Sequence, residues 1–179
     1  RLRQWKKPIS LLFCNKPYAT VLQRAQQCGI PSLCYCPDDF SSFQAYEEAI
    51  LSVLHQNGIE WIVLAGYMRL IRHTLLNAYP KHIVNLHPSI LPAFPGRNAI
   101  EQAYQYPVKV SGITIHYVDE GMDTGPIIAQ YPVFLSIQDS LSTFKEKIHK
   151  VEHVLYPQVV EQITQEIGGS MDDINASCF

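Results

Sequence analysis

Short apolar runs alternate with amphipathic segments along the first half of the chain. The runs end at polar residues or proline, which is typical of strands buried on both faces. The amphipathic segments repeat their apolar positions every three or four residues, and Gly29 and Gly58 follow two of them, as glycine follows many helices. The pattern predicts strands at residues 9–14, 31–36, 61–65 and 83–86, helices at 17–28 and 42–57, and a short helix ending near Tyr79.

The second half of the chain has a different pattern. After a predicted helix at 98–104, the run at 109–118 alternates between apolar and polar residues and is followed by another strand at 127–134. Alternation is typical of a more exposed, antiparallel pair, whereas the apolar strands of the first half are typical of a parallel sheet covered by helices on both faces. A long helix is predicted at 140–165, kinked at Pro157, and a flexible tail at 168–179.

These elements predict an α/β fold with a doubly wound, mostly parallel twisted sheet and an antiparallel C-terminal portion. A chain of 179 residues has room for one substantial hydrophobic core, so we expect a single domain over residues 1–179. The net charge of −2, without a basic cluster beyond the first seven residues, argues against nucleic acid or an anionic membrane as the main partner. No apolar run approaches the roughly 20 residues that cross a bilayer.

The chain has five cysteines at irregular spacing. An odd number argues against a disulfide framework and favours a reducing cytosol. Cys34 and Cys36 lack the two-residue gap that is usual in zinc sites, so we expect no metal and interpret the cysteines as small buried hydrophobic residues.

The candidate chemistry begins with Asn85 and His87, at the end of the strand predicted at 83–86. Ligands of doubly wound sheets bind beyond the carboxyl ends of the strands. His87 is a candidate general acid or base, although a structural histidine bonded to a loop carbonyl is the ordinary alternative. Asn85 can donate to a developing oxyanion or close a turn. Asp123, in a glycine-rich turn, can pair with the imidazole or hold a water, or it only shapes the turn.

Prolines at positions 88, 92 and 95 follow this pair and are expected to stiffen the exit from the strand. Ser89 lacks the G-x-S-x-G elbow of serine hydrolases, which argues against acyl-enzyme chemistry. The histidines at 82, 87 and 116 lack metal-ligand spacing, and no glycine-rich phosphate loop of a common type is present. From the residues alone, we expect an α/β enzyme with an Asn/His/Asp site.

Two longer motifs carry a resemblance to a known family. NLHPSILPAFPG at 85–96 and GITIHYVDEGMDTGPIIAQ at 112–130, together with FCNK at 13–16, LAGYMR at 64–69 and EHVLYP at 152–157, closely resemble the phosphoribosylglycinamide formyltransferases of purine biosynthesis. Related 10-formyltetrahydrofolate hydrolases typically carry a second histidine at the position of Pro88, and tRNA formyltransferases a glycine. The Pro88 and Ser89 pair therefore favours the glycinamide branch.

The resemblance implies a Rossmann-like formyltransferase fold and transfer of a formyl group from 10-formyltetrahydrofolate, a co-substrate, to the amine of glycinamide ribonucleotide, without a metal. It implies that Asn85, His87 and Asp123 are catalytic. The implied folate-binding residues are Met68, Arg69, Leu70, Ile71, Val118, Asp119 and Glu120, and those for the glycinamide substrate are Leu86, Pro88 and Glu152. We expect a monomer or homodimer. The alternatives are a 10-formyltetrahydrofolate hydrolase, transfer to another amine, or a folate-binding protein without catalysis.

The chain departs from the family at two places. Members of the family begin with a strand and a G-x-G-S-N type loop that holds the ribonucleotide phosphate, and the chain starts where that unit should already have ended. Phe43 stands where some relatives place an arginine near the ribose or phosphate. We expect that the sequence omits this N-terminal unit, since otherwise the strand at 9–14 lies beside an unfilled place in the sheet. A working protein without the unit should bind glycinamide ribonucleotide weakly.

Overall fold

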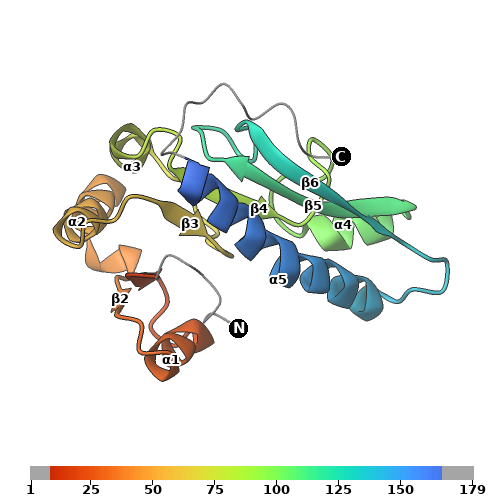
Figure 1. The fold of residues 1–179 in the computed structure, drawn as a ribbon, viewed down its shortest axis with the longest axis horizontal. Coiled ribbons are helices and arrows are strands. Elements are labelled where there is room, and N and C mark those ends of the chain that lie inside the picture. The colour runs from red at the N-terminus through yellow and green to blue at the C-terminus, as the bar shows by residue number, and fades with distance from the viewer. Residues whose placement is uncertain (1–8, 167–179) are drawn as a thin grey trace. The chain divides into compact units, whose positions relative to one another are not determined.

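A computed structural model describes residues 9–166 (Figure 1). Its elements are β1 (Leu12–Cys14), α1 (Thr20–Gln27), β2 (Ser32–Cys34), the 3-10 helix η2 (Pro37–Asp39), α2 (Phe43–Gln56), β3 (Ile62–Leu64), α3 (His73–Ala78), β4 (Ile83–His87), α4 (Ala99–Gln105), β5 (Val110–Tyr117), β6 (Ile127–Phe134) and α5 (Leu141–Glu166). Every strand and helix predicted from the sequence is present, although β1, β2 and β3 are shorter than predicted. The tail predicted at 168–179 lies outside the described residues.

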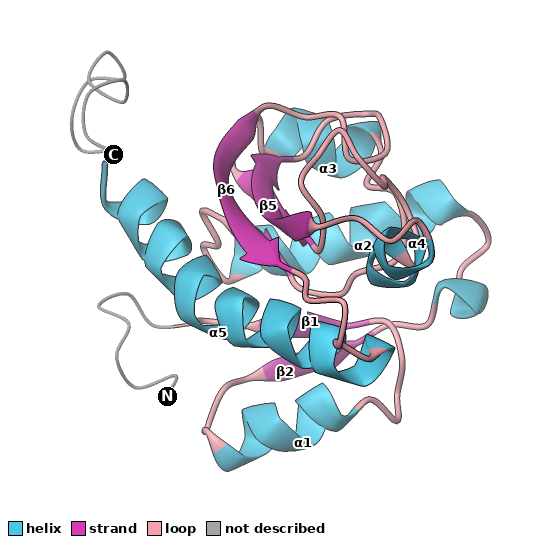
Figure 2. Ribbon diagram, turned by 90° about the vertical axis from the view of Figure 1, so that its right-hand side faces the viewer, coloured by secondary structure: helices cyan, strands magenta, loops and turns pink. Residues whose placement is uncertain are grey.

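The described strands form a pair, β1 with β2, and a four-stranded sheet in the order β3-β4-β5-β6. β1 and β2 are parallel, with Phe13 opposite Leu33. β5 and β6 are antiparallel and lie side by side in Figure 2. This mixture confirms the prediction of an α/β fold with an antiparallel C-terminal portion.

The contacts of the chain group into two compact units. One is formed by the residues up to Val84 together with Tyr117–Gly125, and the other by Asn85–His116 together with the residues from Pro126 onward. The boundaries between the units fall inside β4 and β5. Each unit is described by itself below.

In the first unit, local sequence signals determine where the helices begin and end. Ser42 caps α2, because its hydroxyl accepts a hydrogen bond from the backbone N–H of Ala45 at 3.0 Å. Gly58 follows α2 with a φ of +59°, and its N–H and that of Ile59 donate to the last carbonyls of the helix. The core of this unit joins α2, α3 and the start of β4 through Tyr46, Ile50, Leu54, Ile71, Leu75, Tyr79 and Ile83.

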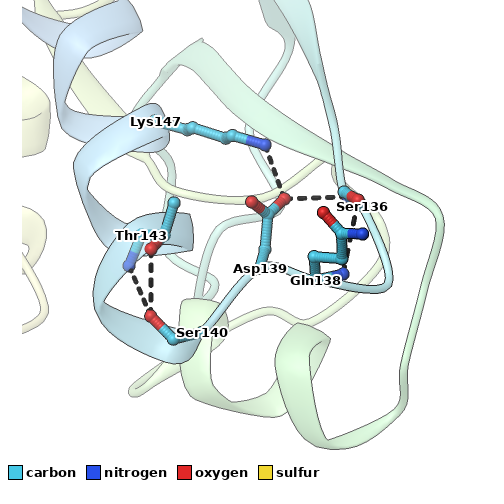
Figure 3. A network of polar contacts seen from close by, with 6 residues as sticks. All are labelled: Ser136, Gln138, Asp139, Ser140, Thr143 and Lys147. Carbon is cyan, nitrogen blue, oxygen red and sulfur yellow. Dashed lines mark hydrogen bonds and ion pairs between the residues drawn. The ribbon is translucent and has the colours of Figure 1, made fainter.

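In the second unit, α4 and α5 pack with β5 and β6 around a core of Ile100, Ala103, Ile113, Val133, Phe144 and Ile148. The connection from β6 to α5 is a polar network (Figure 3). Asp139 accepts from the backbone N–H of Ser136 at 2.8 Å and from Lys147 Nζ at 2.5 Å, and Ser140 caps α5 by accepting from the Thr143 N–H. The hydrogen bond from Lys147 lowers the pKa of the Asp139 carboxyl. A kink at Pro157 inside α5 stays a prediction.

Three expectations about burial were wrong. β5 is not exposed, since every residue from Ser111 to His116 is buried. It is an inner strand, in which buried apolar side chains (Ile113 and Ile115) alternate with buried polar ones (Thr114 and His116). β1 and β3 are only half-buried, because β1 has a single neighbour among the described strands and β3 stands at the edge of its sheet. The described cysteines are not buried hydrophobic residues either: Cys28, at the end of α1, is exposed, and Cys14, Cys34 and Cys36 are half-buried free thiols.

No described helix combines the length and the apolar character that crossing a membrane requires.

Candidate functional site

Asn85 and His87 lie at the carboxyl end of β4, as predicted. The His87 side chain is buried, with its residue 4% exposed, and its Nε2 lies 2.8 Å from the backbone carbonyl oxygen of Phe94. A carbonyl oxygen only accepts, so Nε2 carries a hydrogen in both charge states of the ring.

The loop after His87 is held by a buried hydroxyl from the next strand. Thr114 Oγ1 on β5 accepts from the backbone N–H of Leu91 at 3.0 Å and donates to the Ser89 carbonyl at 2.7 Å. Gln130 on β6 donates both to Thr114 Oγ1 at 3.0 Å and to the Leu91 carbonyl at 2.8 Å. The loop is thus fixed by side-chain hydrogen bonds in addition to its prolines.

Ser89 is part of the same loop and is fully buried. Its hydroxyl donates to the Ala93 carbonyl at 2.5 Å and lies 3.5 Å from the Phe94 carbonyl that contacts His87. The hydroxyl is therefore engaged in closing the loop, which agrees with the sequence argument against a serine nucleophile.

Asn85 contacts a second buried histidine. Its Nδ2 lies 3.2 Å from Nε2 of His116 on β5, and His116 is 2% exposed. Sequence reasoning considered His116 only as a metal ligand and missed this pairing. Among the described residues, no group of three or more His, Cys, Asp and Glu is arranged to hold a metal ion.

Asp123 lies in a turn of the first unit that follows β5. Asp119 Oδ1 accepts from the Gly121 N–H at 3.0 Å and from Thr124 Oγ1 at 2.7 Å, so one carboxylate closes the turn. Asp123 itself has a φ of +57° in the left-handed region, which aspartate tolerates better than most residues. At Gly125 a side chain would collide with the Tyr117 carbonyl. The turn that presents Asp123 is therefore closely specified by its own residues.

The segment 66–72 belongs to the same unit and contains most of the predicted folate-binding residues. Met68 and Leu70 are large apolar side chains that are 67% and 47% exposed. Ile71, in contrast, is buried in the core and anchors the segment there. Val118, at the start of the Asp123 turn, packs against the same core. The structure thus brings the two predicted folate-binding segments into one unit, with exposed apolar side chains on the first and, at Met122, in the turn that continues the second.

Two buried polar groups of α2 hold the segment 66–72. Glu47 is 1% exposed, and its Oε1 accepts from the backbone N–H of Arg72 at 2.8 Å. Burial raises the pKa of the Glu47 carboxyl. The Tyr46 and Tyr67 hydroxyls lie 3.3 Å apart, and burial raises the pKa of both phenols. The Arg72 guanidinium also lies over the Phe43 ring, 4.5 Å from its centre.

The predicted residues for the glycinamide substrate lie in the second unit. Leu86 and Pro88 flank His87 and are half-buried. Glu152 on α5 has a side chain that is 15% exposed, and its Oε2 pairs with Nδ1 of His149 at 2.7 Å. The second unit therefore holds Asn85, His87 and these three residues, and the first unit holds Asp123 with the predicted folate-binding residues.

A family model described as formyl transferase matches residues 1–160. The chain belongs to the formyl transferase family. It is 51% identical to a phosphoribosylglycinamide formyltransferase of Bacillus subtilis over 159 residues, covering 89% of the chain and 82% of that protein. It is 38% identical to the trifunctional purine biosynthetic protein adenosine-3 of Drosophila melanogaster, covering 87% of the chain and 12% of that protein.

The fold of this formyl transferase is also that of solved relatives. The crystal structure of a phosphoribosylglycinamide formyltransferase from Bacillus halodurans aligns with a TM-score of 0.88 at 48% identity, over 92% of the chain and 85% of the relative. The predicted resemblance and fold class are thereby confirmed.

Proposed function

We propose that the chain transfers the formyl group of 10-formyltetrahydrofolate to the amine of glycinamide ribonucleotide, with Asn85, His87 and Asp123 as catalytic residues. The observation that carries the proposal is the end of β4, where a buried imidazole with a fixed Nε2 hydrogen follows an amide whose nitrogen is held by His116. The identity to enzymes of that name supports the choice of reaction.

Asn85 and His87 act on the formyl oxygen. As the amine of the acceptor attacks the formyl carbon, negative charge develops on that oxygen, and an amide hydrogen of Asn85 stabilises it. In other enzymes, loss of one such donor lowers kcat by about 100- to 1,000-fold. His87 adds a positive charge when protonated. Because the Phe94 carbonyl keeps Nε2 protonated, Nδ1 is the nitrogen that can take up and return a proton.

Asp123 keeps the imidazole charged and moves the proton of the attacking amine to the departing folate nitrogen, directly or through water. Its support in the structure is the closely specified turn, since a residue with a positive φ outside glycine is often found at functional sites.

The folate supplies the formyl group, and the segments 66–72 and 118–120 are suited to hold it. Met68 and Leu70 offer exposed apolar surface for a flat ring. Glu47 holds the backbone N–H of Arg72 and the Tyr46 hydroxyl contacts that of Tyr67, so the segment is fixed at both ends and its free backbone groups can be presented without reorganisation. Arg69, Ile71, Val118, Asp119 and Glu120 complete the proposed set, with Ile71 and Val118 acting through their backbone because their side chains pack in the core.

Leu86, Pro88 and Glu152 bind the glycinamide substrate in this proposal. The Glu152 carboxylate is largely buried and suited to a positively charged or hydroxyl-bearing ligand. The free thiols and the reaction class support a cytosolic setting for the enzyme.

Replacing His87 by asparagine tests the mechanism. We expect kcat to fall by about 100-fold or more, because both the charge and the titrating nitrogen are lost, while folate binding stays near the wild-type value. Tetrahydrofolate release is followed by absorbance, and folate affinity by isothermal titration. His82→Asn is the matched control, since His82 also contacts a backbone carbonyl, that of Pro80, but outside the proposed site.

Wild-type turnover in His87→Asn would overturn the assignment of His87. Equal turnover of the wild-type protein with and without glycinamide ribonucleotide would instead indicate a hydrolase, and turnover only with another amine would indicate a different acceptor.

A further inference from the structure

The contact between Asn85 and His116 determines the protonation state of a buried histidine. The atom of Asn85 that faces His116 is the amide nitrogen, which carries only hydrogens and can only donate. His116 Nε2 must therefore accept through its lone pair, at 3.2 Å. A histidine that accepts at Nε2 is neutral and has its hydrogen on Nδ1.

We propose that His116 is a positioning residue for formyl transfer, which fixes the side-chain amide of Asn85 so that nitrogen rather than oxygen faces the developing oxyanion. The amide of asparagine is planar, so one Nδ2 hydrogen bonded to His116 determines the direction of the other. A half-turn of the amide would exchange its nitrogen and oxygen and place a partial negative charge toward the formyl oxygen. This inference rests on the proposed role of Asn85.

The pairing of β5 with β6 is irregular next to His116. Along the β5–β6 ladder, Ile115 pairs with Ala129, but His116 pairs with Ile127, so β6 supplies one residue more than β5 at this point. Such a bulge changes the direction in which a side chain points, and bulges are common beside active sites. Two independent features, the hydrogen bond and the register shift, thus converge on His116.

A purely structural histidine is the competing explanation. It would pack in the interior and satisfy its ring nitrogens, and its replacement would lower stability without a specific effect on turnover. The two explanations differ in whether an acceptor at the position of Nε2 is needed for catalysis.

Direct observation of the ring in the wild-type protein is the first test. In ¹⁵N NMR spectra of histidine-labelled protein, the proposal expects an unprotonated Nε2 and a protonated Nδ1 for His116, assigned by the loss of its signals in a variant. A protonated Nε2 would overturn the proposal, because His116 would then face the oxygen of Asn85.

Kinetics of two variants provide the second test. In His116→Gln the Oε1 atom can still accept near the position of Nε2, and we expect kcat within a few-fold of wild type. In His116→Leu no acceptor remains, and we expect kcat to fall by about 100-fold, with KM for both substrates nearly unchanged. The matched control is Ser111→Ala on the same strand, because the Ser111 hydroxyl is buried and makes no hydrogen bond, so kcat should not change.

A double variant separates this inference from the proposed function. If His116 acts through Asn85, the double variant Asn85→Ala/His116→Leu is no slower than Asn85→Ala alone. A slow Asn85→Ala with a His116→Leu that turns over like wild type or like His116→Gln would overturn only the role of His116. Wild-type turnover in Asn85→Ala would overturn the role of Asn85 and the inference together.

Discussion

Thr114 holds the loop between Ser89 and Leu91 through a single hydroxyl, and replacing it by valine removes that hydroxyl while keeping the shape of the side chain. Valine leaves the Leu91 N–H and the Ser89 carbonyl without their partner, while Gln130 still donates to the Leu91 carbonyl. Thr114 and Ser89 are 0% exposed and Leu91 is 4% exposed, so water does not replace the lost bonds.

The magnitude follows from these two orphaned groups. A buried backbone group left without a partner costs about 1–3 kcal/mol, so we expect Thr114→Val to lower the free energy of unfolding by about 3 kcal/mol. Thr114→Ser keeps the hydroxyl and removes one buried methyl group, which costs about 1 kcal/mol. The difference between the two variants, about 2 kcal/mol, isolates the hydroxyl from the packing of the side chain.

Urea unfolding followed by tryptophan fluorescence and by circular dichroism measures both variants. Coincident transitions and an unchanged m-value are needed before the free energies are compared. We also expect turnover to fall in Thr114→Val more than in Thr114→Ser, because the loop carries the Phe94 carbonyl that contacts His87. A valine variant as stable as the serine variant would refute this account of the loop.

Three further predictions concern single positions outside this loop. Ser42→Ala should destabilise the protein by about 1 kcal/mol through loss of the α2 cap, whereas Ser41→Ala should have little effect on urea unfolding. Gly112→Ala should lower the melting temperature markedly, because a side chain at Gly112 would collide with the Tyr131 carbonyl on β6; an unchanged melting temperature would contradict the packing. Burial raises the pKa of the Glu47 carboxyl, so its contribution to stability is fully present below the ordinary glutamate pKa and is lost as the pH rises through the raised value. Glu47→Gln should therefore flatten the decline of the unfolding free energy as the pH rises above the ordinary glutamate pKa, and an identical decline in both proteins would contradict this assignment.

Local signals made the elements of the fold predictable. Gly29 and Gly58 have positive φ values immediately after α1 and α2, and Ser42 caps α2, so each boundary is encoded within a few residues. Burial was less predictable because it depends on which strands become neighbours. The alternation of β5 was mistaken for exposure, although Thr114 and His116 are buried against partners 25 and 31 positions away in the sequence.

In the candidate site, too, the positions of residues along the chain were predictable, whereas their partners in space were not. The position of Asn85 and His87 at the end of β4 followed from the apolar run before them, and their catalytic role, like that of Asp123, stays a proposal. The residues that hold them, Thr114 and His116, lie inside the motif at 112–130, but the motif does not say what their side chains contact. Before any resemblance is considered, their signal in the sequence was a polar residue at alternate positions of a strand, and its role becomes clear only once the partner segments are known.

The most direct test of the proposed function is the release of tetrahydrofolate from 10-formyltetrahydrofolate, measured by absorbance with and without glycinamide ribonucleotide. The purified chain is assayed beside its His87→Asn variant at equal folate concentration. The account predicts turnover only when the ribonucleotide is present, and its loss in the variant. Folate binding without ribonucleotide-dependent turnover, or release at the same rate in the absence of the ribonucleotide, would contradict it.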